Sequence, residues 1–393
     1  MTPAARVQAA IDVIDRILEN VPAEKALTSW ARRARYAGSK DRAAVRDYVY
    51  QALRCRDSYA AQGGKMTGRA IMLGQIRAEG HDPATLFSGA TYAPAQLTEA
   101  EQRVNGANTH AMPPDAPSDL PQWLMEEFVA SLGDKRAQQA ADTLRKRAPI
   151  TLRVNARKTT RDALIAALAK DGIVTEIVAG VESALHLREA ARRFGQSNAY
   201  HTGEAELQDA HSQAAMACLK SLKDSQILDY CAGGGGKTLA LAAQHNARFF
   251  AYDSDPCRMN DLPKRARRAG IEVEILSAET IKRNGPFDLV LCDAPCSGSG
   301  TWRRHPEAKW ALTPERLKAL CQMQSDILRR AAELIRPDGR IAYTTCSILN
   351  QENEYQIEAF LAEHPHWTLD ETKRWPINDT GDGFFLSVLT CSN

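Results

Sequence analysis

The amino-acid sequence predicts an α/β protein whose main domain is a doubly wound, mostly parallel sheet. Strand-like apolar segments alternate with helix-length segments from about residue 206 to residue 393. The apolar pair Ile227 and Leu228 leads into four consecutive glycines and then into a helical segment. Two later strand-like segments lead to the acid Asp293 and the thiol Cys346. Such alternation is typical of doubly wound sheets, in which ligands and reacting groups gather at the carboxyl ends of the strands.

The length of the chain, 393 residues, suggests more than one hydrophobic core. We expect a helical domain with a linker over residues 1–145, a small α/β subdomain over 146–205 and the main sheet domain over 206–393. Four prolines mark the linker: Pro113, Pro114, Pro117 and Pro121.

Residues 1–65 carry apolar side chains at helical spacing, beginning with Val7, Ile11 and Ile14. Eight basic residues lie around them: Arg32, Arg33, Arg35, Lys40, Arg42, Arg46, Arg54 and Arg56. These residues form either a solvated helical surface or a face that contacts nucleic-acid phosphates. The second alternative predicts binding that weakens steeply with salt.

Each element of the α/β region has its own signal in the sequence. Strand-like segments lie at residues 150–155, 173–177, 227–228, 249–252, 273–276, 289–292, 341–347 and 384–389. Helix-like segments lie at residues 160–171, 238–243, 256–269, 313–334 and 350–361. The helix at 313 has a clear start, because Thr313 can cap it and Pro314 suits its first position. Residues 337–339, Pro-Asp-Gly, should turn the chain into the strand that follows.

The glycine loop admits several interpretations. A phosphate-binding loop would need glycine where Cys231 stands, so the spacing excludes it. A dinucleotide fingerprint fits Gly233 and Gly235 but has Thr238 in place of its third glycine, although Asp253 lies at a suitable distance to hold a ribose. In loops that bind S-adenosylmethionine, an acid after the second strand also holds the ribose hydroxyls. A plain flexible turn is the remaining alternative, and four glycines would be costly there.

The composition does not by itself indicate a nucleic-acid partner. The net charge is +2, from 50 basic and 48 acidic residues, so only local clustering can support such a partner. Nine cysteines form an odd number without a paired C-x-x-C spacing, and no long apolar segment or signal peptide opens the chain. We therefore expect a cytoplasmic protein without a metal or a membrane segment.

Three motifs in the second half of the chain resemble those of the RNA cytosine-C5 methyltransferases. They are residues 229–238, Asp293-Ala-Pro-Cys296 with Arg303-Arg304-His305-Pro306 after it, and Thr345-Cys346-Ser347 with Glu352-Asn353-Glu354 after it. The resemblance covers about residues 150–393 and is closest to bacterial enzymes that act on 16S ribosomal RNA. It implies a Rossmann-like methyltransferase sheet preceded by an RNA-recognition-like subdomain, with S-adenosyl-L-methionine as the cofactor. The helical N-terminus weakly resembles a NusB-like RNA-binding domain.

The resemblance also implies which residues carry the chemistry. Cys346 is the expected nucleophile: it attacks carbon 6 of cytosine so that carbon 5 can take the methyl group, and a thiolate suits this step near neutral pH. Cys296 is expected to support release of the product, and Asp293 to hydrogen-bond the cytosine edge. The expected cofactor-binding residues are Asp229, Cys231, Ala232, Gly233, Gly234, Gly235, Gly236, Lys237, Asp253, Arg258 and Asp293.

The sequence departs from the family pattern at two places. Gly234 stands where the family usually has proline, and Ser277 and Ala278 stand where it often has an acid that holds the adenine. The first departure predicts a looser loop, and the second leaves the adenine contacts unassigned.

The expected partner is RNA, with 16S ribosomal RNA favoured and tRNA as the alternative. The sequence leaves the oligomeric state open and favours a monomer. Arg303, Arg304 and His305 are expected to receive RNA phosphates beside a flipped base. A catalytically silent ribosome-assembly factor is an alternative that the presence of both Cys296 and Cys346 disfavours. A nicotinamide oxidoreductase would leave both thiols unexplained, and the DNA enzymes of similar fold use a single Pro-Cys nucleophile.

Overall fold

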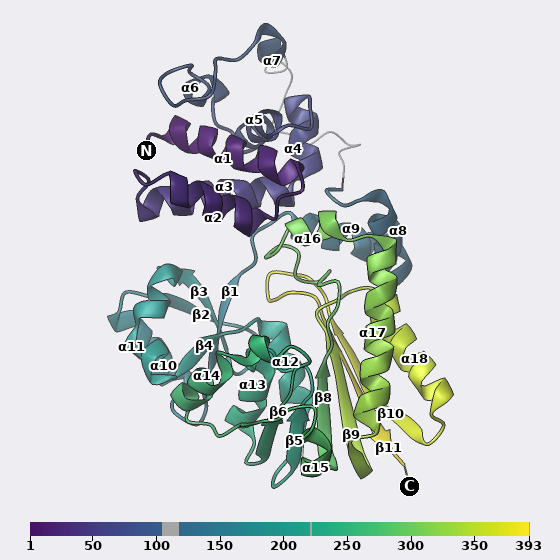
Figure 1. Cartoon of the computed structure of the whole chain (residues 1–393). Helices are drawn as coiled ribbons and strands as arrows, with labels where there is room; N and C mark the ends of the chain where they lie inside the picture. The colour runs from purple at the N-terminus through teal and green to yellow at the C-terminus, as the bar shows by residue number, and fades with distance from the viewer. Residues whose placement is uncertain (104–117, 221, 393) are drawn as a thin grey trace. The chain divides into compact units, whose positions relative to one another are not determined.

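The computed structural model describes residues 1–103, 118–220 and 222–392 (Figure 1). These residues form two compact units. The helical unit comprises Met1–Arg147 and Trp302–Ala311, and the sheet unit comprises Ala148–Thr301 and Leu312–Asn393. The predicted linker residues Pro113, Pro114 and Pro117 lie outside the described residues. The predicted three-domain division stays a prediction.

Amphipathic helices build the helical unit. They are α1 (Pro3–Leu18), α2 (Ala23–Arg33), α3 (Ser39–Arg54), α4 (Arg56–Gly63), α5 (Gly68–Ala78), α6 (Pro83–Leu86), α7 (Glu99–Arg103), α8 (Gln122–Leu132), α9 (Asp134–Leu144) and α16 (Glu307–Ala311). The helically spaced Val7, Ile11 and Ile14 of α1 lie in the hydrophobic core of this unit, as their spacing predicts.

The segment 302–311 belongs to the helical unit, although the chain enters it from the sheet unit. The ammonium of Lys309 donates to the carbonyl of Arg54 at 2.8 Å, and the indole of Trp310 donates to the carbonyl of Leu53 at 2.9 Å. Both carbonyls lie in the last turn of α3, where backbone acceptors have no partner within the helix. The segment therefore caps the C-terminus of α3.

The same segment also satisfies the start of α2. The carboxylate of Glu307 accepts a hydrogen bond from the backbone N–H of Ala23 at 2.7 Å. Ala23 is the first residue of α2, and the preceding Pro22 makes no side-chain cap. At the beginning of the segment, the ring of Trp302 stacks on Phe128 of α8 with 5.9 Å between the ring centroids. Residues 302–311 are thus an integral part of this core.

A small antiparallel sheet opens the sheet unit, with the strand order β2-β3-β1-β4. Its strands are β1 (Ile150–Val154), β2 (Val174–Ile177), β3 (Ala184–Glu189) and β4 (Ala205–Leu207). Its helices are α10 (Arg161–Lys170), the 3₁₀ helix η2 (Ala191–Gln196) and α11 (Asn198–Thr202). The sequence predicts β1, α10 and β2 but does not predict β3 or β4.

A seven-stranded sheet forms the centre of the sheet unit, with the order β10-β11-β9-β8-β5-β6-β7. Its strands are β5 (Gln226–Asp229), β6 (Arg248–Ala251), β7 (Glu274–Ile275), β8 (Phe287–Asp293), β9 (Ile335–Thr345), β10 (Trp367–Trp375) and β11 (Phe384–Cys391). The strands from β5 to β9 pair in parallel, whereas β11 and β10 pair antiparallel. The predicted mostly parallel α/β sheet is therefore confirmed.

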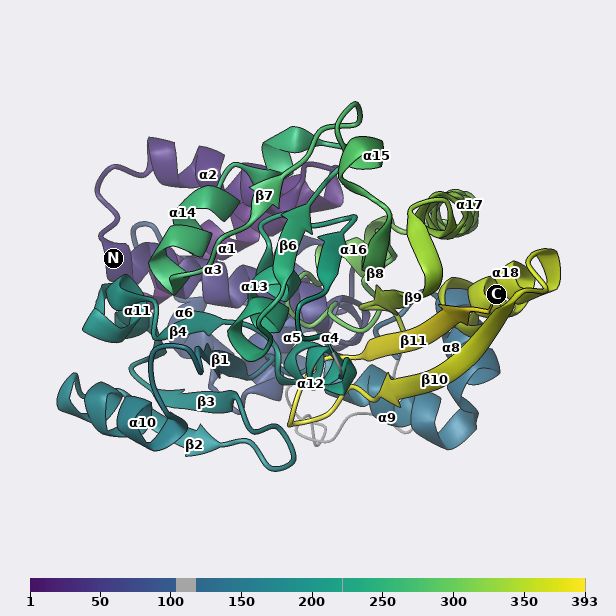
Figure 2. The ribbon, with the colours of Figure 1, turned by 90° about the horizontal axis from the view of Figure 1, so that it is seen from below.

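Helices cover both faces of this sheet (Figure 2). They are α12 (Ala210–Cys218), α13 (Gly236–Gln244), α14 (Leu262–Ala269), α15 (Ile281–Asn284), α17 (Pro314–Ala332) and α18 (Glu354–Glu363), with 3₁₀ helices η3 (Pro256–Met259) and η4 (Asn350–Glu352). Neighbouring residues of β5 enter opposite cores: Ile227 packs with α12, α13 and α14, and Leu228 packs with α17 and α18. Thr313 caps α17 by accepting from the N–H of Arg316, as predicted.

Two predicted details of the large sheet are wrong. Residues 337–339 do not turn the chain ahead of a strand, because they lie inside β9. Asp338 has a φ of 61°, and the pairing of β9 with β8 shifts between Phe287 and Leu289, so the segment is an irregularity within the strand. The predicted helix 256–269 is divided into η3 and α14. None of the described helices has the length and apolar character needed to cross a membrane.

Candidate active site

The glycine loop joins the end of β5 to the start of α13, which begins at Gly236. Gly233 and Gly235 have positive φ values of 49° and 76°, which side chains other than glycine rarely adopt. A Cβ on Gly235 would lie 2.2 Å from Cδ1 of Leu262. The backbone conformation therefore requires glycine at both positions, and close packing against Leu262 also requires it at position 235.

Two buried acids flank this loop. Oδ2 of Asp253, which follows β6, accepts a hydrogen bond from the N–H of Gly233 at 2.9 Å, and Arg258 pairs with the same oxygen at 3.1 Å. Asp229 ends β5, and its Oδ2 accepts from the hydroxyl of Thr238 at 2.6 Å. Burial raises the pKa of Asp229 to about 7.

The loop fits S-adenosylmethionine. The first turn of α13 directs free N–H groups toward the loop, and glycine leaves the backbone open to a ligand. The carboxylate of Asp253 lies against the loop at the end of the second strand, where it can accept from ribose hydroxyls. Cys231 and Ala232 complete the loop between Asp229 and the glycines. Their individual roles in binding stay predictions.

The thiols of Cys296 and Cys346 lie together beyond the ends of β8 and β9, with 3.4 Å between the two sulfur atoms. The hydrogen bond from Cys296 lowers the pKa of Cys346, although burial opposes this shift. The same contact, together with burial, raises the pKa of Cys296 well above its ordinary value. Of the two thiols, Cys346 is therefore the one that loses its proton more readily.

Asp293 at the end of β8 connects the thiols with the glycine loop. Its Oδ2 accepts from the ammonium of Lys237 at 2.6 Å, and its Oδ1 accepts from the hydroxyl of Thr344 at 3.2 Å. Burial lowers the pKa of Lys237, but the charge and the hydrogen bond of Asp293, together with weaker effects of Cys346 and Asp229, outweigh burial, so the pKa is raised overall. Lys237 is therefore a fixed cation, and its charge also lowers the pKa of Cys346.

Glu352 fixes the loop that carries Cys296. Its Oε1 accepts from the backbone N–H of Ser297 at 2.7 Å and from the side-chain amide of Gln324 at 3.1 Å. The same amide of Gln324 donates to the carbonyl of Pro295 at 2.9 Å. The side chain of Glu352 is fully buried, so this carboxylate is held by the backbone and by α17.

A second group of polar side chains fixes the segment after Cys346. The hydroxyls of Ser299 and Ser347 lie 2.9 Å apart, and the hydroxyl of Ser299 accepts from the N–H of Ile348. Asn353 donates to the carbonyl of Ser347 at 3.0 Å. The Glu352-Asn353 pair lies in a motif that the sequence shows, whereas no pattern in the sequence indicates the supporting role of Gln324, Ser299 and Ser347.

The expected phosphate contact of Arg303 is wrong. Arg303 is only 1% exposed and belongs to the helical unit, where its carbonyl accepts from the guanidinium of Arg54 at 2.7 Å. Arg54 is buried as well and so cannot be part of a solvated basic face. Arg304 is partly exposed and His305 is exposed. Among the described residues, no group of three or more His, Cys, Asp or Glu side chains could hold a metal ion.

The parallel sheet, the glycine loop and the acid after β6 define an S-adenosylmethionine-dependent methyltransferase of Rossmann-like fold. Residues 216–390 match the model of the 16S rRNA methyltransferase RsmB/F family, and residues 120–192 match the ferredoxin-like domain of RsmF/B-like methyltransferases. The chain belongs to the RsmB/F methyltransferase family. The predicted family and cofactor are confirmed.

Individual relatives agree with this membership. The chain is 35% identical over 283 residues to ribosomal RNA small subunit methyltransferase B of Sodalis glossinidius, covering 68% of this chain and 65% of the relative. It is 32% identical over 283 residues to the protein of that name from Vibrio cholerae, covering 69% of this chain and 65% of the relative. The chain thus spans slightly less than two thirds of the length of these relatives.

Solved structures show the same fold. The crystal structure of PH0851 superposes with a TM-score of 0.74 at 25% identity and covers 99% of both chains. A methyltransferase homologue from Pyrococcus horikoshii superposes with a TM-score of 0.60 at 23% identity, covering 69% of this chain and 95% of its own.

Proposed function

We propose that this protein transfers a methyl group from S-adenosylmethionine to carbon 5 of a cytosine in RNA, with 16S ribosomal RNA as the substrate. The observation that carries the proposal is the pair of thiols, Cys296 and Cys346, whose sulfur atoms lie 3.4 Å apart. Carbon 5 of cytosine is a weak nucleophile, so the ring needs a covalent activator before it can take a methyl group. A thiolate held beside a second thiol supplies one.

The first step is attack by the sulfur of Cys346 on carbon 6 of the cytosine ring. The sulfur–carbon bond forms, and the electrons of the carbon 5–carbon 6 double bond become available at carbon 5. Asp293 and Lys237 form an ion pair whose charges act on Cys346, and the carboxylate of Asp293 would accept from the exocyclic amine of the base. S-adenosylmethionine supplies the methyl group, which leaves the sulfonium as carbon 5 takes it.

The second step is release, which we assign to Cys296. The hydrogen bond with Cys346 is the main cause that raises the pKa of Cys296, ahead of burial and of the charge of Cys346. Once Cys346 is bound to carbon 6 as a neutral thioether, that cause is removed, and Cys296 can give its proton to water. The resulting thiolate takes the proton from carbon 5, the ring double bond forms again, and the bond from carbon 6 to Cys346 breaks. Formation of the adduct thus lowers the pKa of Cys296, the base that then removes the carbon 5 proton and releases the product.

The choice of RNA rests on the relatives. Those from Sodalis glossinidius and Vibrio cholerae are named ribosomal RNA small subunit methyltransferase B. An RNA substrate also agrees with the small sheet, which lies in the same unit as the catalytic sheet. Most of this small sheet falls within residues 120–192, which match the ferredoxin-like domain of RsmF/B-like methyltransferases. A tRNA substrate is the alternative within the same chemistry.

The proposal is tested with RNA that contains 5-fluorocytidine, because fluorine at carbon 5 cannot leave as a proton and traps the adduct. We expect a covalent protein–RNA complex with the wild-type protein and with Cys296→Ala, but none with Cys346→Ala. An adduct that persists in Cys346→Ala would refute the assignment of the nucleophile.

Mass spectrometry of 5-methylcytidine identifies the substrate. Ribosomal RNA and tRNA are separated from cells with and without the gene, and from cells that carry Cys346→Ala. Loss of the modification from 16S ribosomal RNA alone supports the proposal, and loss from tRNA alone overturns the substrate. Loss from neither RNA overturns the activity and favours an assembly factor.

A further inference from the structure

A buried carboxylate at the edge of the small sheet holds three arginines. Glu206 of β4 accepts from Arg153 of β1 at 3.2 Å, from Arg265 of α14 at 3.0 Å and from Arg268 of α14 at 2.5 Å. The side chain of Glu206 is 6% exposed. Burial opposes its ionisation, but the hydrogen bonds and charges of the three arginines together outweigh burial and lower the pKa of Glu206. The carboxylate therefore stays charged and connects α14 with the small sheet.

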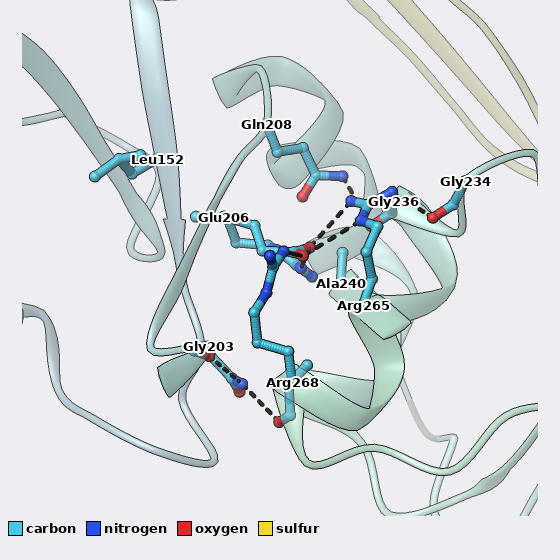
Figure 3. A network of polar contacts seen from close by, with 12 residues as sticks. Leu152, Gly203, Glu206, Gln208, Gly234, Gly236, Ala240, Arg265 and Arg268 are labelled. Carbon is cyan, nitrogen blue, oxygen red and sulfur yellow. Dashed lines mark hydrogen bonds and ion pairs between the residues drawn. The ribbon is translucent and has the colours of Figure 1, made fainter. Parts of the chain in front are cut away.

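Arg265 differs from the other two arginines because it also reaches the glycine loop. While Nη2 of Arg265 pairs with Glu206, its Nη1 donates to the carbonyl of Gly234. Figure 3 shows the guanidinium of Arg265 placed between Glu206 and Gly234, with Arg268 approaching Glu206 from the other direction. Arg265 thus connects Glu206 of the small sheet with the cofactor loop.

Gly234 leaves room for this contact. A Cβ on Gly234 would lie 2.8 Å from Nη1 of Arg265, which is too close, so a side chain there would displace the guanidinium. The absence of a side chain at position 234 and the position of Arg265 are therefore linked. The sequence predicts a looser loop from this glycine, and the arginine supplies a restraint at the same residue.

A second side chain from the same edge of the small sheet contacts the loop directly. The amide of Gln208 donates to the carbonyl of Gly236 at 3.2 Å. Gln208 and Glu206 are two positions apart, so they leave an extended chain on the same side. Two carbonyls of the loop, those of Gly234 and Gly236, are therefore held from this edge (Figure 3).

We propose that Arg265 is a positioning residue for the cofactor: anchored by Glu206, it fixes the backbone of the glycine loop through the carbonyl of Gly234. A loop that is already ordered loses less conformational entropy when it binds a ligand, so the ligand binds more tightly. The inference rests on the proposed function only in that the glycine loop binds S-adenosylmethionine. It requires neither an RNA substrate nor a thiol nucleophile.

The chain provides a matched control for this role. Arg265 and Arg268 lie on the same helix and share the carboxylate of Glu206, but only Arg265 donates to Gly234. Replacement of Glu206 would leave the buried Arg153 and the partly buried Arg265 and Arg268 without their carboxylate and could unfold the protein. Replacement of one arginine leaves two cations on that carboxylate, so Arg265→Gln and Arg268→Gln are the informative pair.

The measurement is binding of S-adenosylhomocysteine to the full-length protein by isothermal titration calorimetry. We expect Arg265→Gln to weaken binding about tenfold, since a hydrogen bond from a charged donor is typically worth about one power of ten in an equilibrium constant. Arg268→Gln should stay within about twofold of wild type, because its contacts do not include the loop. Equal losses in the two variants, or no loss in Arg265→Gln, would overturn the proposal.

Hydrogen exchange separates loop order from overall stability. The backbone amides of residues 233–237 should exchange faster in Arg265→Gln than in Arg268→Gln, even where the two variants have similar melting temperatures. Equal exchange in this segment would overturn the proposal. If wild-type protein does not bind S-adenosylhomocysteine at all, the proposed function fails instead, so the two failures are distinguishable.

A second variant tests the same contact if Arg265→Gln does not fold. Gly234→Ala should weaken binding of S-adenosylhomocysteine by displacing Arg265. Arg265→Lys keeps the positive charge but lacks the guanidinium, whose two nitrogens bind Glu206 and Gly234 at the same time, so it should give an intermediate loss of affinity. Where all proteins fold, Gly234→Ala should cost less affinity in the Arg265→Gln background than in wild type. Full additivity of the two changes contradicts the proposal.

Discussion

The ammonium of Lys237 lies 2.6 Å from Oδ2 of Asp293, which ties the first turn of α13 to the end of β8. This ion pair is the direct connection between the loop expected to hold the cofactor and the strand that leads to Cys296. Because the second oxygen of Asp293 accepts from Thr344 in β9, the carboxylate also fixes the strand that leads to Cys346. The carboxylate of Asp293 therefore connects the expected cofactor loop with the strands that lead to the two thiols.

Loss of the charge of Lys237 should make Cys346 less reactive. The charge of Lys237 lowers the pKa of Cys346, whereas the charge of Asp293 raises it. Lys237→Met removes the favourable charge and leaves the unfavourable one, so less thiolate is present at pH 7. We expect alkylation of Cys346 by iodoacetamide, followed by peptide mass spectrometry, to slow roughly threefold to tenfold. Lys264→Met on the exposed side of α14 is the control, and an unchanged or faster rate in Lys237→Met contradicts this account.

Removal of Cys296 should trap the enzyme on its RNA. In Cys296→Ala the nucleophile can still form its adduct, but the group assigned to proton removal is absent, so release is slow. We expect a retarded protein–RNA band on a denaturing gel with unmodified RNA and S-adenosylmethionine. Cys321→Ala, which changes a thiol of α17 outside the pair, should behave like wild type. Normal turnover of Cys296→Ala without a trapped band would show that another group is the base.

The site could be predicted from the sequence where its residues stand at strand ends. The glycines after Leu228 and the residues Asp293 and Cys346 follow apolar strands, and parallel strands bring their carboxyl ends to one edge. Contacts that depend on the folding of distant segments could not be predicted in this way. Glu206 and Arg265 are separated by 59 positions in the chain, and neither lies in a recognisable motif.

Two errors have the same physical origin. Arg303 looked like a phosphate contact because it is basic and follows the Cys296 loop, but its segment is buried within the helical unit. The antiparallel edge strand β10 gave no signal because most of its residues, from Thr368 to Trp375, are exposed or partly exposed and four of them are charged. Tertiary contacts determined both outcomes, and local composition does not report them.

The buried carboxyl of Asp229 should make stability depend on pH. Burial raises its pKa to about 7, whereas an unfolded aspartate titrates near pH ~3.9. Between these values the folded protein holds a proton that the unfolded chain has released, so the free energy of unfolding falls as the pH rises from about 4 to 7. Asp229→Asn cannot titrate and keeps an acceptor for Thr238.

The stability of Asp229→Asn relative to wild type should therefore increase between pH 5 and pH 8. Urea denaturation at several pH values in this range measures the difference, and Asp162→Asn in the exposed first turn of α10 is the control. Stability curves of Asp229→Asn and wild type that run parallel across this range would show that Asp229 does not titrate there.

The last prediction concerns the cap that Glu307 provides for α2. Glu307 accepts from the first N–H of the helix, and its negative charge also suits the positive end of the helix dipole. Because Pro22 offers no side-chain cap, Glu307→Ala should destabilise the start of α2 by about 1 kcal/mol, and Glu307→Gln by less because it keeps an acceptor.

The protein has two compact units, so a local probe is preferable to a single melting temperature. We expect the amides at the start of α2 to exchange several-fold faster in Glu307→Ala, as hydrogen exchange with mass spectrometry would detect. Glu358→Ala, on the exposed face of α18, should leave these amides unchanged. Equal exchange in Glu307→Ala and Glu358→Ala would mean that residues 302–311 do not stabilise α2, and that the segment is retained in the helical core by its other contacts, which include those of Trp302, Lys309 and Trp310.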